Sequence, residues 1–366
     1  EARLTKHFAD MGYKFSVYAD IPDREEDICY PLMTRAAEMV RDKRCPIFKR
    51  KMFYFSTTYF LQNTDGAQCH QLMEYLRDET DYPTELVWQN LLRCAPLTEL
   101  MQSMQLDYVF APAPEAEAEV LLRSHDMALL MAVANEDDMN IALTHAAVLP
   151  TGTPIAIATD TEAHRKLLAS RCKAKKLAAE VFVAPAEALA NHDLAGVFAQ
   201  RLTAHEYTCI ADLYHAAKPF VLSSQESRVE RALSCVLGER GQVAQILSQF
   251  DKEPCLGLML TPQASHGEYF AQFGSEWHSW YPLEEKLLHE LQLDAPLTDE
   301  PLRNTEGCFW ARRKLLQSLR EETQIRAAMD KVEIDPYMEI ILRQTLLPLC
   351  GQKNGMFTAQ VLSCEA

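Results

Sequence analysis

Histidine and aromatic residues gather in two neighbouring stretches in the last third of the chain. A short, almost wholly apolar run over 256–261 precedes them, bounded by Pro254 and Pro262, which is typical of a strand buried on both faces of a parallel sheet. Open α/β sheets bind ligands just beyond the carboxyl ends of their strands. We therefore expect these side chains to line a cleft: His266, Tyr269, Phe270, Trp277, His278 and Trp280.

The elements that would hold such a cleft follow from the pattern between residues 127 and 213. Apolar strands are expected over 127–134, 154–159, 180–184 and 207–213, separated by helices over 137–148, 162–172 and 186–201. Strands that alternate with single helices pair in parallel through right-handed crossovers. The sequence thus predicts one mainly parallel α/β sheet beyond residue 119, with helices on both faces. Its buried strands are expected to carry Leu129, Ile157, Val181, Ile210 and Leu258.

The flanking regions have mainly helical patterns. Before residue 113, helices are expected over 2–11, 31–41 and 66–104, the last broken at Pro83 and Pro96, and strands over 13–19 and 107–111. After residue 213, helices are expected over 225–237, 241–250, 284–291, 313–329 and 336–347, and a closing strand over 356–362. Trp88 lies on an apolar helical stripe, where it could be a core residue or a ligand platform.

The stretch over 111–119, Ala-Pro-Ala-Pro-Glu-Ala-Glu-Ala-Glu, offers almost nothing to bury and predicts a domain boundary. We expect a smaller, helix-rich α/β region over 1–112, a linker over 113–119 and an α/β domain over 120–366. Because the chain starts at Glu1 and enters a helical pattern at once, we expect it to be a fragment of a longer protein.

Composition and charge exclude several classes of function. The 366 residues carry a formal net charge of −16, which disfavours a nucleic-acid surface because phosphate contacts require a basic field. No Walker-type loop, GxGxxG, HExxH or GxSxG motif occurs, and only 12 glycines are present, so a glycine-cradled phosphate site is not expected. The eleven cysteines are scattered without zinc spacing, which indicates reduced thiols in a cytoplasmic protein.

A basic cluster between residues 41 and 51 leaves two interpretations open. It could contact an anion, either a membrane surface or a nucleotide phosphate, or it could form a solvated loop and helix end. Its members are Arg41, Lys43, Arg44, Lys49, Arg50 and Lys51.

Asp160 and Glu162 follow the second expected strand and leave a similar choice. Two carboxylates at this spacing could hold a metal ion. Acidic residues that open a helix after a strand are equally typical of an N-terminal cap.

Several motifs occur together along the chain. The run Leu-Gly-Leu-Met-Leu-Thr-Pro at 256–262 is followed by His-Gly-Glu-Tyr-Phe at 266–270, Gly-Ser-Glu-Trp at 274–277 and Cys-Phe-Trp-Ala-Arg at 308–312. With the segments 44–53, 75–82, 86–93 and 149–162, this pattern resembles the rhamnan synthesis protein F family, glycosyltransferase-like proteins that assemble bacterial cell-surface polysaccharides. The resemblance covers nearly the whole chain.

The resemblance implies a sheet of the nucleotide-sugar-transferase type and a nucleotide-sugar donor, either dTDP-rhamnose or a UDP-hexose. It also implies a glycan or lipid-linked glycan acceptor and other domains of the same polypeptide as partners, with residues 1–112 as the tail of a preceding transferase-like domain. Together with the reduced thiols and the basic cluster, this leads us to expect a cytoplasmic location at the inner face of the membrane, with a peripheral membrane contact.

Transfer from such a donor requires a base for the acceptor hydroxyl and positive charge for the leaving diphosphate, from side chains or from a divalent metal whose ligands stay unassigned. In this fold these groups stand at strand ends, so the expected catalytic residues are Asp193, Asp212 and His215. The expected substrate-binding residues are His192, Lys218, His266, Tyr269, Trp277, Trp310 and Arg312. Trp310 could equally pack its strand into the core. We expect His266, Tyr269 and Trp277 to share one concavity with Asp212 and His215.

The chain departs from the family at four places near these strand ends. It has Ala-Val-Ala-Asn at 132–135 for His-x-Tyr-Tyr, only Asp193 of Asn-Arg-Gly-Arg-Asp, Tyr-His-Ala-Ala at 214–217 for His-Asp-Lys-Lys, and Asp-Pro-Tyr at 335–337 for Asp-Gly-Thr. Each lost cation removes charge-assisted contacts of about 1.5–3 kcal/mol. We therefore expect nucleotide sugars to bind weakly, with a Kd on the order of high micromolar to millimolar. A glycosyltransferase and a non-catalytic module that binds glycan or partner proteins both stay open, beside a structural subunit contact.

Overall fold

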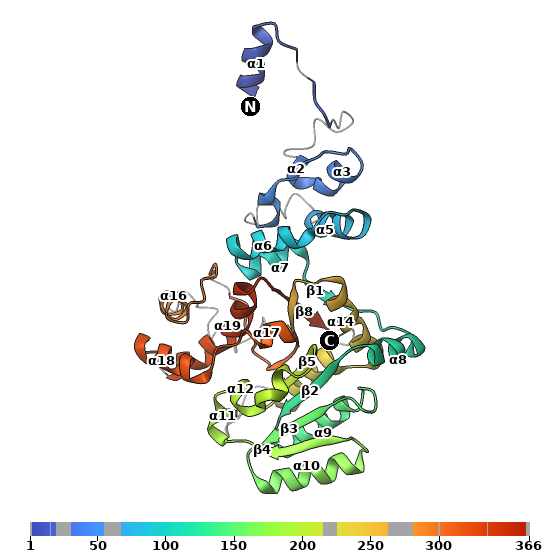
Figure 1. The fold of residues 1–366 in the computed structure, drawn as a ribbon, viewed down its shortest axis with the longest axis vertical. Helices are drawn as coiled ribbons and strands as arrows, with labels where there is room; N and C mark the ends of the chain where they lie inside the picture. Colours follow the sequence, from blue (N-terminus) through green and yellow to red (C-terminus); the bar gives the residue numbers. More distant parts are fainter. Residues whose placement is uncertain are drawn as a thin grey trace. The chain divides into compact units, whose positions relative to one another are not determined.

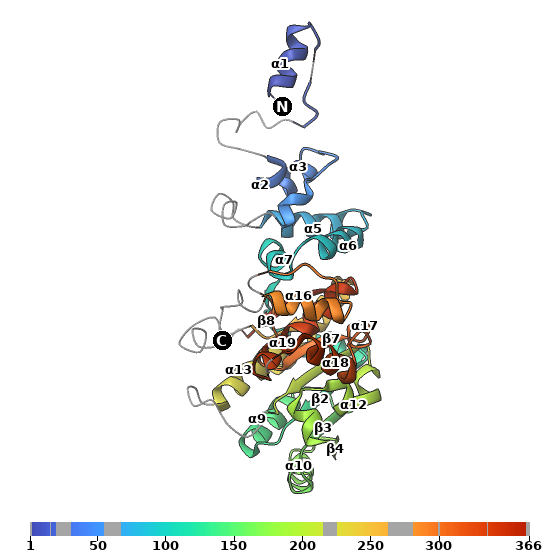
Figure 2. The same ribbon diagram turned by 90° about the vertical axis from the view of Figure 1, so that its left-hand side faces the viewer.

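Figures 1 and 2 show the protein in a computed structural model, which describes residues 2–14, 16–19, 31–54, 67–214, 225–262, 281–298, 301–334 and 336–363. The chain forms two compact units. Unit 1 comprises Glu1–Thr84 and Gln102–Gln105, and unit 2 comprises Glu85–Met101 and Leu106–Ala366.

The described part of unit 1 is helical. It contains α1 (Ala2–Asp10), α2 (Pro31–Thr34), α3 (Ala36–Arg41), the 3-10 helix η2 (Arg50–Phe53) and α5 (Gln68–Glu79). Helices α3 and α5 pack together, and α5 buries Leu72, Met73 and Leu76 at helical spacing. The Cys69 thiol donates to the Met52 carbonyl oxygen at 3.0 Å, which ties η2 to α5.

Two predictions for unit 1 are wrong. The helix expected over 31–41 is interrupted at Arg35, whose φ of −143° leaves the helical region. The strand expected over 13–19 is not formed by the residues described there, and Tyr13, Val17 and Tyr18 are exposed. An alternating pattern alone cannot make a strand, because backbone N–H and C=O groups also need a neighbouring strand as partner.

Helices α6 (Thr84–Cys94) and α7 (Leu97–Met104) begin just after Pro83 and Pro96, as the sequence predicts. Trp88 of α6 is 2% exposed and stacks on Phe357 with 4.0 Å between ring centroids. The Gln352 amide donates to the carbonyl oxygens of Leu92 and Ala95 at 2.9 and 2.8 Å. Of the two interpretations of Trp88, the structure supports the core residue.

Unit 2 is built on an eight-stranded sheet in the order β1-β8-β6-β7-β5-β2-β3-β4. Its strands are β1 (Asp107–Val109), β2 (Met127–Ala132), β3 (Ile155–Thr159), β4 (Ala179–Val183), β5 (Tyr207–Asp212), β6 (Leu256–Leu260), β7 (Cys308–Arg312) and β8 (Phe357–Leu362). All neighbours pair in parallel except β7, which is antiparallel to β5 and β6. The predicted mainly parallel α/β sheet is confirmed. Because β5 and β6 both run opposite to β7, they end at the same edge, which we call the carboxyl edge.

The centre of the sheet is covered on both faces, since every residue of β2, β3, β5 and β6 is buried. Leu129, Ile157, Ile210 and Leu258 are fully buried, as predicted. Val181 is only half-buried, which contradicts the prediction for this residue. The reason is its position on β4, a strand at one end of the sheet order, which has a neighbouring strand on one side only.

The helices that precede or connect the strands are α8 (Glu115–Ser124), α9 (Glu136–Ala146), α10 (Glu162–Ala174), α13 (Gln225–Leu237) and α14 (Arg240–Lys252). Helix α8 begins inside the expected linker, because alanine and glutamate favour a helix. It packs with α14, where a Cβ at Gly241 would lie 2.5 Å from the Ala113 carbonyl oxygen. Strand β1 pairs with β8, so residues 107–109 belong to the large sheet. The two units thus divide the chain elsewhere than at 113–119.

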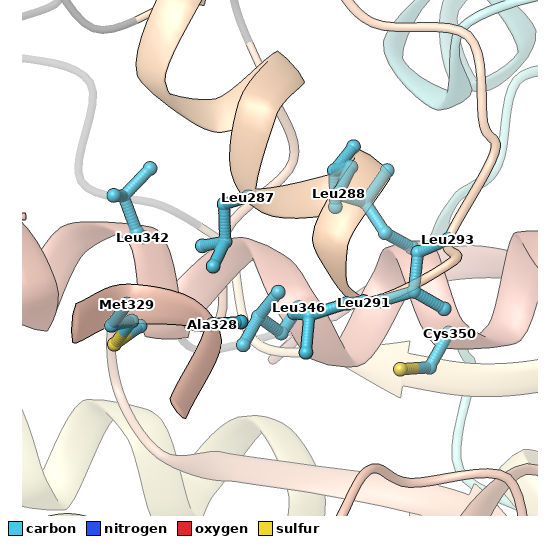
Figure 3. Packing of buried hydrophobic residues seen from close by; sticks show 10 residues of the cluster. Leu287, Leu288, Leu291, Leu293, Ala328, Met329, Leu342, Leu346 and Cys350 are labelled. Carbon is cyan, nitrogen blue, oxygen red and sulfur yellow. The ribbon is translucent and has the colours of Figure 1, made fainter. Parts of the chain in front are cut away.

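Four C-terminal helices complete unit 2: α16 (Tyr281–Glu290), α17 (Arg313–Leu316), α18 (Glu322–Val332) and α19 (Pro336–Lys353). The single helix expected over 313–329 is divided, because Glu321 and Gln324 form a capping box that starts α18. Figure 3 shows leucines of α16 and α19 in one buried cluster with Met329 of α18. Leu287 and Leu342 in this cluster are fully buried.

The nine described cysteines are free thiols, eight of them buried and Cys94 exposed. Within the described residues, no helix is both long and apolar enough to cross a lipid bilayer.

Candidate functional site

Asp212 ends strand β5 at the carboxyl edge of the sheet, in a position that Gly307 makes possible. The Asp212 backbone N–H donates to the Gly307 carbonyl oxygen at 2.9 Å. Gly307 has a φ of +68°, and a Cβ there would lie 2.3 Å from the Asp212 carbonyl oxygen. Both the left-handed conformation and the close approach therefore require glycine. The Asp212 side chain is held at the edge with 7% exposure.

A break in the helix expected over 186–201 brings His192 to Asp212. Helix α11 (Ala186–Ala190) ends, His192 adopts a left-handed φ of 54°, and α12 (Leu194–Phe198) and the 3-10 helix η3 (Ala199–Thr203) follow. The His192 Nδ1 lies 2.8 Å from the Asp212 Oδ2. The prediction of a single helix is wrong because Asp193 starts a new helix as its N-cap.

The electrostatics of this pair favour the charged form of the histidine. Burial opposes a charge on His192, but the negative charge of Asp212 and the hydrogen bond to it outweigh burial and raise the pKa of His192 above its ordinary value. The positive charge of Arg343 acts against this rise. With Nδ1–H donating to Asp212, the Nε2 of the neutral ring is an acceptor that can take a proton from a hydroxyl group.

Asp193, one of the expected catalytic residues, has a structural contact. Its Oδ1 accepts a hydrogen bond from the Gly196 backbone N–H at 2.8 Å, and a Cβ at position 196 would lie 2.0 Å from its Oδ2. The carboxylate therefore caps α12 and holds the turn that contains His192. A catalytic role for Asp193 stays a prediction.

The choice between a cap and a metal site at residues 160–162 is clearer in the structure. The Thr161 Oγ1 accepts from the His164 backbone N–H at 3.2 Å, so Thr161 is the cap of α10. The carboxylates on either side have other partners, since Asp160 Oδ1 lies 2.6 Å from His164 Nδ1 and Glu162 pairs with Arg165. Across the described residues, no group of three or more His, Cys, Asp and Glu side chains is arranged to hold a metal ion.

A cavity of about 290 Å³ lies beside His192 and Asp212. One wall is polar and comes from the residues before β7, where the Asn304 Oδ1 and the Thr305 Oγ1 are buried without a hydrogen-bond partner in the described structure. The other wall is largely apolar and includes Leu346 and Cys350, which also belong to the cluster in Figure 3. The cavity therefore suits a ligand with both hydroxyl groups and an apolar face.

Three arginines that sequence reasoning missed line this cavity: Arg228, Arg320 and Arg343. Arg228 and Arg343 lie on helices α13 and α19, and Arg320 lies in the segment between α17 and α18, so only the fold brings them to the site. Arg228 of α13 donates to the Glu306 Oε2 at 3.2 and 3.3 Å, and Arg231 lies 3.5 Å from the Glu306 Oε1.

Arg343 of α19 is bound still more fully by acidic neighbours. It donates twice to Glu322 at 2.7 Å and once to Glu339 at 2.9 Å. Arg326 joins the same group at 2.9 Å from Glu339. These contacts hold α18 against α19 and leave Arg343 little freedom to turn to a ligand.

Trp310 and Arg312, expected to bind substrate, lie elsewhere. Trp310 is fully buried, and its Nε1–H donates to the Val236 carbonyl oxygen at 2.8 Å, so the structure places it in the core. Arg312 lies at the opposite edge of the sheet, opposite Tyr207 at the start of β5. Its guanidinium donates to the carbonyl oxygens of Leu256 and Phe250. Of the two interpretations of Trp310, the structure supports the core residue. Arg312 lies away from the expected site because β7 is antiparallel and carries its last residues away from the carboxyl edge.

The other expected site residues lie outside the described part of the chain: His215, Lys218, His266, Tyr269 and Trp277. Their concavity with Asp212 stays a prediction. The strands that precede them, β5 and β6, end at the same edge, as that prediction requires.

Residues 1–338 match the model of a family described as rhamnan synthesis protein F. A comparison with curated proteins found no significant match. Similar solved structures include glucosyl-3-phosphoglycerate synthase from Mycobacterium tuberculosis in complex with Mn²⁺, UDP and glucosyl-3-phosphoglycerate. It has 11% identity and a TM-score of 0.30 over 69% of this chain and 77% of that chain.

A second structure, titled only as a mycobacterial protein, has 13% identity and a TM-score of 0.32 over 69% of this chain and 70% of that one. The same synthase with Mn²⁺, UDP-glucose and glycerol 3-phosphate has 11% identity and a TM-score of 0.30 over 70% and 78%. Likeness of this extent carries no conclusion about the present chain.

Proposed function

Because the chain belongs to the rhamnan synthesis protein F family, we propose that unit 2 transfers a sugar from a nucleotide-sugar donor to a glycan acceptor in the synthesis of a rhamnan-type surface polysaccharide. The observation that carries this proposal is the His192–Asp212 pair at the carboxyl edge of the sheet, beside a cavity of about 290 Å³. In parallel α/β sheets, this edge is where ligands bind.

In the proposed reaction, His192 is the general base. Asp212 holds the Nδ1–H, so that Nε2 faces the acceptor hydroxyl and takes its proton as the hydroxyl oxygen bonds to the anomeric carbon of the donor sugar. The bond from that carbon to the diphosphate oxygen breaks in the same step, and the nucleoside diphosphate leaves. The side-chain amide oxygen of Asn304 and the Thr305 hydroxyl are hydrogen-bond partners for sugar hydroxyls. Their pairing with a ligand removes the penalty for a buried unsatisfied polar atom, about 1–3 kcal/mol each.

The donor in this proposal is dTDP-rhamnose or a UDP-hexose, and the acceptor is a free or lipid-linked glycan. A divalent cation, when bound, would supply positive charge to the leaving diphosphate. Other domains of the same polypeptide would act beside unit 2 on the cytoplasmic side of the membrane. The basic cluster over 41–51 is the proposed peripheral membrane contact, although Arg41 already pairs with Asp42 at 2.8 Å.

The proposal is tested by sugar transfer itself. The purified chain is incubated with dTDP-rhamnose or UDP-hexoses and a glycan acceptor, with and without manganese, and acceptor-dependent release of the nucleoside diphosphate is measured. We expect His192→Gln to lower kcat by about 10²–10⁴-fold, the usual contribution of a general base. His205→Gln is the matched control, because His205 also pairs with an aspartate, Asp126, at 2.6 Å but at the other edge of the sheet. Equal rates for His192→Gln and the wild type would refute the assignment.

The second candidate is a non-catalytic module that binds glycan or partner proteins. One observation favours it: Arg228 and Arg343 form ion pairs with glutamates. These two cations of the cavity are therefore not available to a diphosphate. This candidate predicts glycan binding without donor turnover, and the same assay with a glycan titration separates the two.

A further inference from the structure

Arg320 differs from the other arginines of the cavity in how its guanidinium is used. Its Nε donates to the Leu291 carbonyl oxygen at 3.2 Å, and neither terminal nitrogen has a hydrogen bond or an acidic partner in the described residues. Arg228 and Arg343, by contrast, each pair with a glutamate. Arg320 therefore presents an open cationic edge on the wall of the cavity.

The surroundings of Arg320 fix this edge in place. The capping box that begins at Glu321 starts α18 immediately after Arg320. Leu291, which anchors the Nε, belongs to the buried cluster with Cys350 (Figure 3). Because the Nε is held and the next residue caps α18, little side-chain entropy is lost when the two terminal nitrogens bind a ligand.

The negative charges around the cavity do not neutralise Arg320, because each has another partner. Asp212 is bound by His192, and Asp193 caps α12. Glu306 pairs with Arg228 and Arg231, and Glu322 pairs with Arg343 and Arg326. A partly buried cation without a counter-ion favours an anionic ligand.

We propose that Arg320 anchors the phosphate of a sugar-phosphate moiety in this cavity, with the sugar hydroxyls on Asn304 and Thr305. The inference rests on the proposed function and names the chemistry of its ligand. A planar guanidinium whose two terminal nitrogens form one open edge matches a phosphate through two parallel hydrogen bonds. The side-chain amide oxygen of Asn304 accepts hydrogen bonds only, so it requires hydroxyl donors. The ligand should therefore have both an anionic group and hydroxyl groups. Its phosphate could come from the donor diphosphate or from a lipid-linked acceptor.

Calorimetry on the whole chain tests this inference with glucose 1-phosphate, UDP and uncharged glucose as probes. We expect Arg320→Met to weaken phosphate binding about ten- to a hundredfold, as for the loss of a charge-assisted hydrogen bond. Glucose binding should not change, and Arg320→Lys should retain part of the affinity. If Arg320→Met loses affinity for UDP, the phosphate belongs to the donor. If it loses affinity for glucose 1-phosphate alone, the phosphate belongs to the acceptor.

The matched control is Arg93→Met, since the Arg93 Nε also donates to a backbone oxygen, that of Gln89 at 2.9 Å, away from the cavity. Unchanged phosphate affinity in folded Arg320→Met, or no phosphate binding by the wild type, would overturn the inference. Its failure is distinguishable from failure of the proposed function, because His192→Gln acts on transfer and Arg320→Met on phosphate affinity.

Discussion

Two histidine–aspartate pairs lie at opposite edges of the same sheet. His192 and Asp212 meet at 2.8 Å where β5 ends, and His205 and Asp126 meet at 2.6 Å before β5 and β2 begin. The side chain of Asp212 is 7% exposed beside the cavity, whereas that of Asp126 is 56% exposed. The same two residue types therefore form a candidate site at one edge and a surface ion pair at the other. Their surroundings, and not their chemistry alone, make the difference.

The arginines of the two edges differ in the same way. At the opposite edge, where β5 and β6 begin and which we call the amino edge, Arg312 donates to the Leu256 and Phe250 carbonyl oxygens. Its guanidinium lies over the Tyr207 ring at 5.3 Å from the centroid. At the cavity, the Nε is the one guanidinium nitrogen of Arg320 that has a hydrogen bond within the described part of the chain. An arginine whose guanidinium is fully engaged by protein groups stabilises the fold, whereas one with unbound terminal nitrogens can bind a ligand.

The largest effect on stability is expected at the amino edge. Arg312→Met leaves two buried carbonyl oxygens unpaired and should lower the free energy of unfolding by about 3 kcal/mol. Arg313→Met, which removes a half-exposed pair with Glu206, should cost less than about 1 kcal/mol. Denaturant unfolding of both variants measures the difference. If both variants lose the same free energy of unfolding, the hydrogen bonds of Arg312 do not stabilise the fold as we expect.

Gly307→Ala tests the support of Asp212. The left-handed conformation and a Cβ at 2.3 Å from the Asp212 carbonyl oxygen should together lower the free energy of unfolding by about 2–3 kcal/mol. The variant should also transfer sugar more slowly. Gly355→Ala is the control, since Gly355 has a φ of +75° but open space around its Cβ, and should cost about 1 kcal/mol. If both variants unfold alike, the close approach at Gly307 has no energetic weight.

The pH dependence of transfer should report on His192. A base must be neutral, so the rate should rise with pH through the raised pKa of His192. Asp212→Asn removes the charge that raises this pKa, while burial and Arg343 still lower it, so the remaining rate should rise at lower pH. Initial rates between about pH 5 and 9 measure the shift. An unmoved profile would mean that another group titrates.

The smallest effect is expected for Asp126. The hydrogen bond from His205 lowers the pKa of Asp126, so its stabilisation is present above the ordinary carboxyl pKa and is lost as pH falls through the lowered value. Because the carboxylate is more than half exposed, Asp126→Asn should cost below about 1 kcal/mol at pH 7 and nothing at pH 2. A cost above about 2 kcal/mol in urea unfolding at pH 7 would make this pair more than a surface contact.

The comparison also separates what the sequence predicts from what only the fold reveals. Strand ends such as Asp212 follow from apolar runs, because a buried strand imposes a local pattern. The contact of His192 with Asp212 depends on a break inside an expected helix, for which Asp193 as N-cap is the only local signal. Arg320 could not be found this way, since its place in the cavity arises from packing between distant helices.

The antiparallel strand β7 shows the same limit. Its residues 308–312 are as apolar as those of a parallel strand, so periodicity cannot give its direction. That direction decides which residues reach the cavity. It brings Gly307 to Asp212 and takes Arg312 to the other edge.

The most direct test of the account is the rate of sugar transfer by Asp212→Asn and Asp126→Asn, measured side by side with the same donor and acceptor. Both substitutions remove one carboxylate charge from a histidine, and thermal unfolding of each variant checks that it is folded. If the carboxyl edge holds the active site, Asp212→Asn should lower kcat by at least about a hundredfold and Asp126→Asn by less than about twofold. Equal rates for the two variants would contradict the assignment of the site to His192 and Asp212.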